Sequence, residues 1–261
     1  MRVLITGATS GLGTELAVQL ARRGWKLALT GRREEKLRQA AAAAATAGAK
    51  EVLVLPGSVC DLQDVKRHYA EIKQAWGGLD WAILNAGVGD SMNAREFEAE
   101  VYRWTYETNV FGVANWMEAV IPDMVKQGSG AIAGIASLAA FRGLPQSGPY
   151  CSSKAALVTM LESTRVDLRG TGVDVVTVCP GFVKSEMTDR NDPKDMWFLM
   201  EVDDGVREIV KGIDARKRIV HFPWALSLPM KYVVHNLPGF LYDWVVSRVT
   251  KRSKRPSRPR A

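Results

Sequence analysis

The chain has 261 residues, of which 35 are Lys or Arg and 28 are Asp or Glu, so its formal net charge is +7, and 47% of its residues are hydrophobic. This composition excludes a disordered chain and a coiled coil, and the length fits one α/β domain or two small domains with a sizeable core. Three Cys residues without a CxxC pair are too few for a disulfide framework or a four-ligand zinc site, which favours a reduced, cytoplasmic setting.

The predicted elements alternate between strands and helices in chain order. Short β-rich runs predict strands at residues 1–7, 26–30, 51–55, 80–85, 131–136, 173–179 and 218–222. Helical stretches are predicted at residues 12–23, 33–47, 61–76, 98–126, 149–169 and 203–215. This alternation predicts a doubly wound α/β fold, with a parallel sheet of about seven strands covered by helices on both faces. No linker interrupts residues 1–222, which we interpret as a single domain.

A glycine cluster, TGATSGLG at residues 6–13, follows the first predicted strand and leads directly into a helix. Glycines allow the backbone to turn tightly and approach a pyrophosphate, which binds the N–H groups at the start of the helix. The order of strand, cluster and helix therefore predicts a nucleotide site. The predicted contacts in this turn are Gly7, Thr9, Ser10, Gly11, Leu12 and Gly13.

The end of the second predicted strand bears on the choice of nucleotide. Folds that select NAD place an acid there to bind the ribose 2′-hydroxyl, whereas an Arg accommodates a 2′-phosphate. Gly31 stands at the position of the acid and Arg32 follows it, which favours NADP(H) over NAD(H). The alternative is that Arg32 and Arg33 are solvated charges at a helix start.

Tyr150 and Lys154 are four residues apart on a predicted helix, so their side chains share one face. A cation beside a phenol favours the phenolate and lowers a pKa that is ordinarily about 10, which suits a general acid or base working near neutral pH. The Y-x-x-x-K pattern alone is usual on helix surfaces. Ser137 lies 13 residues upstream of Tyr150, just past the fifth predicted strand, and adds weight to the pattern.

These motifs resemble the short-chain dehydrogenase/reductase family over about residues 1–190. The resemblance implies a Rossmann-like fold, an active site of Ser137, Tyr150 and Lys154, and a water held at Asn109 in a proton relay. It implies hydride transfer between a nicotinamide and a carbonyl or alcohol, with Tyr150 as general acid/base, Ser137 on the substrate oxygen and Lys154 on the ribose. The alternative is a non-catalytic nucleotide-binding sensor or a membrane-associated scaffold on the same fold.

The resemblance also implies further contacts to the coenzyme and an assembly. The additional coenzyme contacts are Val59, Asn85, Ala86, Gly87, Tyr150, Lys154, Pro180, Gly181, Val183 and Ser185. Two positions depart from the family pattern: Ser58 replaces an Asp that reaches the adenine, and Ser185 replaces a Thr. A homodimer or homotetramer is implied, formed through the helices predicted at residues 98–126 and 149–169.

Residues 223–250 form a predicted hydrophobic, aromatic-rich helical extension, and six of the 21 aromatic residues lie between residues 222 and 244. Apolar residues at 237, 240, 241, 244, 245 and 249 follow one helical face. Two interpretations remain open. The extension packs over the substrate cleft or a second subunit, or residues 223–261 contact an anionic membrane surface peripherally.

The basic excess lies at the end of the chain. Residues 251–261 hold six Lys or Arg and no acid, which leaves residues 1–250 with 29 basic and 28 acidic side chains, a net of +1. We predict a basic disordered tail there, with no specific nucleic-acid partner, because aromatic residues and a recognised module are lacking.

An apolar run at residues 197–200, Trp-Phe-Leu-Met, occupies the segment where the resembled family carries its substrate loop. With the apolar extension, it predicts a hydrophobic, lipid-like or steroid-like substrate. His68, His221 and His235 lack partners at metal-ligand spacing, so we interpret them as packed or surface residues, with no metal site. Asp61 is predicted to cap a helix.

Overall fold

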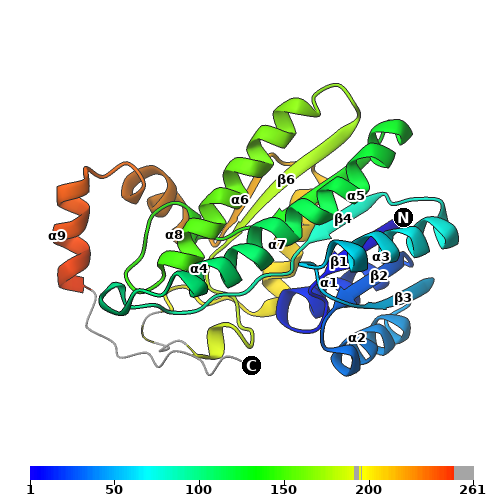
Figure 1. The fold of residues 1–261 in the computed structure, drawn as a ribbon, viewed down its shortest axis with the longest axis horizontal. Coiled ribbons are helices and arrows are strands. Elements are labelled where there is room, and N and C mark those ends of the chain that lie inside the picture. The colour runs from blue at the N-terminus through cyan, green and yellow to red at the C-terminus, as the bar shows by residue number, and fades with distance from the viewer. Residues whose placement is uncertain (191–193, 195, 250–261) are drawn as a thin grey trace.

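A computed structural model describes residues 1–190, 194 and 196–249. Within these residues, seven parallel strands form one sheet: β1 (Arg2–Thr6), β2 (Lys26–Gly31), β3 (Glu51–Pro56), β4 (Trp81–Leu84), β5 (Gly130–Ile135), β6 (Val173–Pro180) and β7 (Ile219–Phe222). The strand order is β3-β2-β1-β4-β5-β6-β7, so the winding reverses between β1 and β4 (Figure 1). The predicted Rossmann-like, doubly wound sheet is confirmed.

Helices cover both faces of this sheet. The helices α1 (Gly11–Ala21), α2 (Glu34–Thr46) and α7 (Val202–Asp214) pack on one face, and α3 (Leu62–Trp76), α5 (Gly112–Gln127) and α6 (Gly148–Asp167) pack on the other. Successive residues of β1 serve the two cores alternately: Val3 and Ile5 belong to the first and Leu4 to the second, and all three are fully buried. Burial on both faces explains why the strands appear in the sequence as continuous apolar runs.

The helix predicted at residues 98–126 is interrupted in the structure. It consists of α4 (Ala99–Tyr106), a π-helical turn (Glu107–Phe111) and α5 (Gly112–Gln127). Apolar spacing alone does not reveal such a turn. A π-helical turn holds one residue more than an α-helical turn, which changes the spacing of the apolar positions too little to be seen in the sequence. π-Helical turns are frequent at functional sites, and this one contains Asn109.

The C-terminal extension follows β7 and lies at one end of the molecule (Figure 1). It consists of α8 (Trp224–Leu228), a π-helical turn (Pro229–Val234) and α9 (Gly239–Val249). The predicted apolar face of α9 is exposed at Phe240, Leu241, Trp244 and Val245, so these side chains do not pack over a cleft of the described chain. Packing against a second subunit and contact with a membrane both remain open. Tyr242, on another side of α9, is the residue that is buried.

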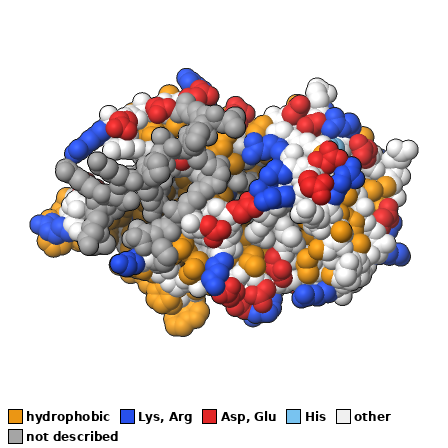
Figure 2. Space-filling model, turned by 90° about the horizontal axis from the view of Figure 1, so that it is seen from below, with side chains coloured by type: hydrophobic (Ala, Val, Ile, Leu, Met, Phe, Trp, Pro, Cys, Tyr) orange, Lys and Arg blue, Asp and Glu red, His pale blue; other side chains and the backbone are white. Residues whose placement is uncertain are grey.

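The surface of the body mixes both signs of charge. Lys and Arg side chains lie among Asp and Glu side chains over the body of the molecule (Figure 2), in keeping with its nearly neutral composition. The predicted basic tail at residues 251–261 lies outside the described residues. In the part of the chain that the structure describes, every helix is too short or too polar to cross a bilayer.

Candidate functional site

The segments predicted to act together leave the sheet at its carboxyl edge. The glycine-rich turn follows β1, Asn85–Gly87 follows β4, Ser137 follows β5 and Gly181–Ser185 follow β6. The winding of the sheet reverses between β1 and β4, where loops diverge and open sheets of this type bind ligands. The topology therefore gathers the predicted residues at one edge of the sheet.

The glycine-rich turn is packed too tightly for side chains at two positions. A Cβ on Gly7, whose φ is +66°, would lie 2.8 Å from the Cα of Ala86, and a Cβ on Gly13 would lie 2.2 Å from the carbonyl oxygen of Gly7. Asn85 locks the turn to the loop after β4, because its Nδ2 donates to the carbonyl oxygens of Thr6 (3.0 Å) and Gly7 (3.2 Å). The backbone thus forms a rigid cradle.

The start of α1 is suited to an anion. Ser10 is the N-cap residue but its side chain accepts no capping hydrogen bond, and the first turn of the helix contains no acid. The first N–H groups of a helix need an outside partner, and the helix dipole favours a negative one. A Cβ on Gly11 would lie 3.0 Å from the Cβ of Ser185, so the loop after β6 lies against this turn. The cradle and the helix start together fit a coenzyme pyrophosphate.

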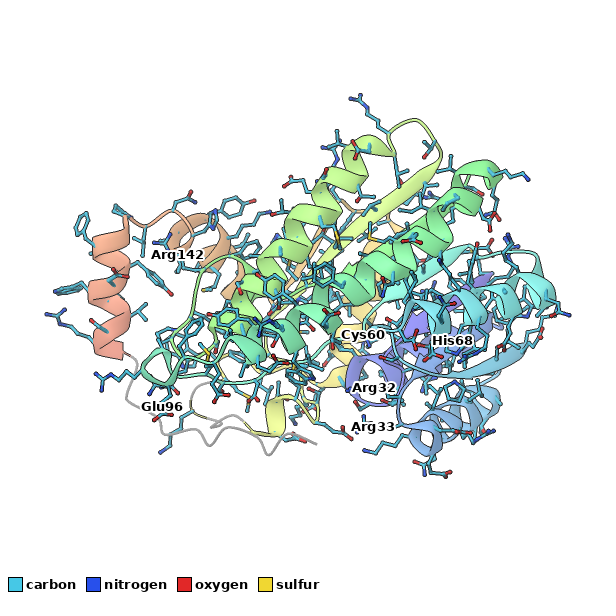
Figure 3. All side chains as sticks on the ribbon, viewed as in Figure 1. Arg32, Arg33, Cys60, His68, Glu96 and Arg142 are labelled. Atoms are coloured by element: carbon cyan, nitrogen blue, oxygen red, sulfur yellow. The ribbon has the colours of Figure 1, made fainter. Side chains whose placement is uncertain are left out.

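Arg33, rather than Arg32, contacts the glycine-rich turn. The Arg33 guanidinium donates to Thr9 at both Oγ1 (3.1 Å) and the carbonyl oxygen (3.3 Å). It also pairs with Glu186 (2.7 Å), which forms a second ion pair with Lys36. Arg32 is exposed, and both arginines lie beside the start of α2 (Figure 3). The structure thus places Arg33 against the glycine-rich turn. That Arg32 accommodates a 2′-phosphate stays a prediction.

Asn109 is fully buried and connects three segments. Its Oδ1 accepts from the N–H of Val88 (2.8 Å), and its Nδ2 donates to the carbonyl oxygen of Val88 (2.8 Å) and to Oγ of Ser153 (2.9 Å). Ser153 in turn donates to the carbonyl oxygen of Tyr150 (2.8 Å). Both amide hydrogens are used, so the implied relay water would bind a remaining lone pair or the main-chain carbonyl. Sequence reasoning did not identify Ser153.

Tyr150 and Lys154 project from the first turns of α6 toward the loop after β4. The Lys154 Nζ lies 5.8 Å from the centre of the Tyr150 ring and donates to the carbonyl oxygen of Ile135 (2.7 Å). A Cβ on Gly87 would lie 3.2 Å from this Nζ and 3.4 Å from Oδ1 of Asn109. Gly87 thus allows Lys154 and Asn109 to approach the same stretch of backbone.

Ser137 completes this cluster. Its hydroxyl caps a short 3-10 turn by accepting from the N–H of Ala139 (3.1 Å), and it also forms a hydrogen bond with the phenol of Tyr150. The structure therefore brings Ser137, Tyr150 and Lys154 together, although they come from different elements of the fold.

The pKa of Tyr150 differs from the sequence prediction. Tyr150 as a whole is only partly buried, but desolvation of its phenol by the surrounding protein raises its pKa, and the hydrogen bond with Ser137 opposes this only in part. Lys154 is not among the groups that shift the pKa of Tyr150, contrary to the expectation. Burial lowers the pKa of Lys154 itself to about 8. The phenol therefore holds its proton at neutral pH.

The loop after β3 is hydrogen-bonded to α3 and to α5. The N–H of Ser58 donates to Asp64 (2.9 Å), the Ser58 hydroxyl accepts from Cys60, and the carbonyl oxygen of Val59 accepts from Asn115 (2.9 Å). Hydrogen bonds and a neighbouring Arg67 lower the pKa of Asp64 despite partial desolvation. Asp61 caps α3 as predicted, by accepting from the N–H groups of Gln63 and Asp64.

The segment after β6 is fixed at its base. The N–H of Gly181 donates to the carbonyl oxygen of Phe222 (2.7 Å), and buried Val183 pairs with Met200 through an isolated β-bridge. Trp197 and Phe198, from the predicted apolar lid, are 61% and 57% exposed. Residues 191–193 and 195 of this segment lie outside the described residues, so the lid stays a prediction.

The histidines are engaged in packing contacts. His68 is buried and contacts the carbonyl oxygen of Pro56 (3.1 Å), His221 contacts Ser227 Oγ (2.7 Å), and His235 contacts the carbonyl oxygen of Phe141 (2.6 Å). Burial and the neighbouring Arg67 lower the pKa of His68. Across residues 1–190, 194 and 196–249, no three His, Cys, Asp or Glu side chains gather closely enough to hold a metal ion.

Known proteins resemble this chain in both sequence and structure. A family described as short chain dehydrogenase matches residues 1–195. An uncharacterized oxidoreductase of Myxococcus xanthus (strain DK1622) is 43% identical over 250 residues, which cover 94% of this chain and 96% of that protein. An 11-beta-hydroxysteroid dehydrogenase of Pinus massoniana is 30% identical over 259 residues, which cover 93% of this chain and 72% of that protein. The crystal structure of a short chain dehydrogenase/reductase from Burkholderia phymatum in complex with NAD superposes on this chain with a TM-score of 0.81 at 26% identity. The superposition covers 88% of this chain and 91% of that one.

Proposed function

Because the chain belongs to the short-chain dehydrogenase/reductase family, we propose that it transfers a hydride between NADP(H) and a carbonyl or alcohol carbon of a hydrophobic small molecule. The observation that carries this proposal is the meeting of Ser137, Tyr150 and Lys154 at the carboxyl edge of the sheet, beside the pyrophosphate cradle. A phenol and a hydroxyl that both reach one point can hold and protonate a single substrate oxygen.

Each residue of the cluster has a distinct role in this proposal. Ser137 donates a hydrogen bond to the substrate oxygen and stabilises the charge that develops there. Tyr150 passes its proton to that oxygen during reduction, or takes one during oxidation. Lys154 holds the ribose hydroxyls, and the first N–H groups of α1 hold the pyrophosphate. When bound, the nicotinamide coenzyme supplies or accepts the hydride.

The raised pKa of Tyr150 supports its role as the proton donor in carbonyl reduction. Burial keeps the phenol protonated, so the residue can donate to a carbonyl oxygen. We expect alcohol oxidation to become faster relative to carbonyl reduction as the pH rises, because oxidation needs a group that accepts the proton.

Lys154 provides a test of this buried environment through stability. Its pKa in the folded protein is about 8, below the roughly 10.4 of an unfolded chain, so between these values the unfolded chain holds more protons. Stability from this residue therefore rises with pH across that window, by on the order of 3 kcal/mol in all. We expect the unfolding free energy of the wild type, measured by urea titration, to increase relative to that of Lys154→Met as the pH rises from about 8 to 10. Parallel curves would contradict the low pKa.

The basic side chains at the start of α2 support NADP(H) as the preferred coenzyme. Arg33 contacts the glycine-rich turn and Arg32 is adjacent, so both can reach a phosphate on the adenosine ribose. The structural neighbour from Burkholderia phymatum holds NAD, so the preference of this chain rests on its own arginines.

We expect the double variant Arg32→Ala/Arg33→Ala to weaken NADPH binding at least tenfold and NADH binding much less, because a charged hydrogen bond contributes about 1.5–3 kcal/mol. Fluorescence titration with each coenzyme measures this, and the single variants divide the effect between the two residues. Arg38→Ala is the matched control, since Arg38 is an exposed Arg on the same helix that pairs with Glu34. Equal losses for both coenzymes would show that the arginines do not select the phosphate.

A hydrophobic substrate is supported by the exposed side chains of Trp197 and Phe198, in the segment after β6, and by the similarity to a hydroxysteroid dehydrogenase. The experiment that tests the proposed function mixes the full chain with NADPH and ketones of increasing chain length, and follows the loss of reduced nicotinamide. We expect kcat/KM to rise with the apolar surface of the ketone. Absence of NADPH oxidation across the series, with coenzyme bound, would contradict the proposal.

A homo-oligomer is also part of the proposal. Exposed apolar side chains on the outer helices support it, namely Phe111 before α5, Val125 on α5 and Val166 on α6. Sedimentation velocity of the full chain distinguishes a monomer from a dimer or tetramer.

A further inference from the structure

The C-terminal extension presents an apolar surface that the rest of the described chain leaves uncovered. We define the C-terminal apolar patch as the exposed side chains Trp224, Leu228, Tyr232, Val233, Phe240, Leu241, Trp244 and Val245. Phe240 and Trp224 are 78% and 73% exposed, which is unusual for large aromatic residues. Aromatic rings project outward from α9 (Figure 3), so the patch forms one end of the molecule.

The inner side of the extension is firmly attached, so the outward direction of the patch is built into the fold. Arg142 donates to the carbonyl oxygens of His235 (2.9 Å) and Leu237 (3.0 Å), and its guanidinium lies 4.5 Å from the centre of the Tyr242 ring. The Tyr242 hydroxyl donates to the carbonyl oxygen of Gly143 (2.6 Å). These contacts fix the orientation of α9 and leave its opposite face to the surroundings.

The net charge of the protein belongs to the same part of the sequence as this patch. Residues 223–261 contain eight Lys or Arg and one acid, Asp243, whereas residues 1–222 contain 27 basic and 27 acidic side chains and are neutral. The extension and the following segment therefore carry the whole net charge of +7. Two cations lie against rings of the patch: the Arg248 guanidinium is 4.0 Å from the centre of the Trp244 ring, and the Lys231 ammonium is 5.2 Å from that of Tyr232. Figure 2 shows hydrophobic side chains beside basic ones at this end.

We propose that the C-terminal apolar patch docks on an anionic lipid bilayer, with its rings among the headgroups and its cations on the lipid phosphates. Aromatic residues beside basic ones are typical of helices that lie in the membrane interface. A second copy of the chain fits less well, because a two-fold contact would bring two segments of net charge +7 together. This proposal does not depend on the proposed enzymatic function.

Vesicle cosedimentation of the full chain tests it. We expect binding to phosphatidylcholine vesicles that contain phosphatidylglycerol, little binding to phosphatidylcholine alone, and weaker binding at high salt. The variant Phe240→Ser/Trp244→Ser should lower the partition coefficient about tenfold or more. Phe97→Ser/Trp197→Ser is the matched control, since it also removes one exposed Phe and one exposed Trp, each 61% exposed.

Three results would overturn the proposal: no binding to the anionic vesicles, equal binding to both vesicle types, or equal losses in the patch variant and its control. Circular dichroism melting of both variants confirms that each is folded before binding is compared. Sedimentation velocity adds an independent result. Loss of self-association in the patch variant, without vesicle binding by the wild type, would assign the patch to a second copy instead.

Discussion

Replacement of Tyr150 by Phe is expected to lower kcat at least 100-fold on any ketone that the wild type reduces, while NADPH affinity stays within about twofold. The change removes only the hydroxyl that donates the proton, and general acid catalysis by one positioned group contributes about 10²–10⁴-fold. The ring remains to pack against Gly89, where a Cβ would lie only 3.0 Å from it. Steady-state kinetics and a coenzyme titration on the same preparation separate the two effects.

Tyr232→Phe is the control for this experiment, because it removes a hydroxyl from a Tyr that is 60% exposed in the extension. Its kcat should equal that of the wild type. Near-normal turnover by Tyr150→Phe would show that the proton comes from another group. Loss of NADPH binding in that variant would mean that Tyr150 holds the coenzyme and that its chemical role is untested by kcat.

Gly13→Ala is expected to abolish NADPH binding and to destabilise the fold by about 1–3 kcal/mol or more. The added Cβ would lie 2.2 Å from the carbonyl oxygen of Gly7, 2.8 Å from Nδ2 of Asn85 and 2.9 Å from the Cα of Ala8. Two of these atoms are backbone, so the turn must move, and Asn85 must release its hydrogen bonds. Urea denaturation measures the stability, and fluorescence titration measures the binding.

Gly239→Ala is the matched control, since nothing lies within 4 Å of a Cβ at that position. It should leave both quantities unchanged or add slightly to the stability, because Ala favours a helix. Wild-type NADPH affinity in Gly13→Ala would contradict the assignment of this turn as the pyrophosphate cradle.

The sheet could be predicted from the sequence because each of its strands is marked by a pattern of neighbouring residues. Each strand is a short apolar run buried on both faces, as Val3, Leu4 and Ile5 illustrate, and the alternation with helices determines a parallel arrangement. The glycine-rich turn could also be predicted from the spacing of its glycines. Gly7, for example, has a positive φ and lies too close to Ala86 for a side chain, so another residue would be strained there. Resemblance then indicated Ser137, Tyr150 and Lys154, whose proximity depends on how α6 packs against the loop after β5.

Other parts of the site depend on tertiary contacts that no local pattern encodes. One example is the hydrogen bond from Arg33 to Thr9, and another is the contact of Arg142 with His235, because each joins segments that are far apart in the chain. The π-helical turn that contains Asn109 is a third feature that the apolar spacing does not show. The pKa of Tyr150 is another case. A helical spacing shows that Lys154 is near, but only the structure shows that Lys154 donates to Ile135 and is itself desolvated.

The Arg142 contacts also set an order of events during synthesis. The segment between Ser137 and Tyr150 is bonded to His235, Leu237 and Tyr242, which are made 93 to 99 residues later than their partners. At about 5–20 residues per second, the ribosome reaches them about 5–20 s after the segment itself. A nascent chain can therefore pair β1 to β6 while the region around Ser137 and Tyr150 still lacks these contacts. Stalled or prematurely terminated chains would contain the glycine-rich turn but lack the contacts that hold the segment between Ser137 and Tyr150.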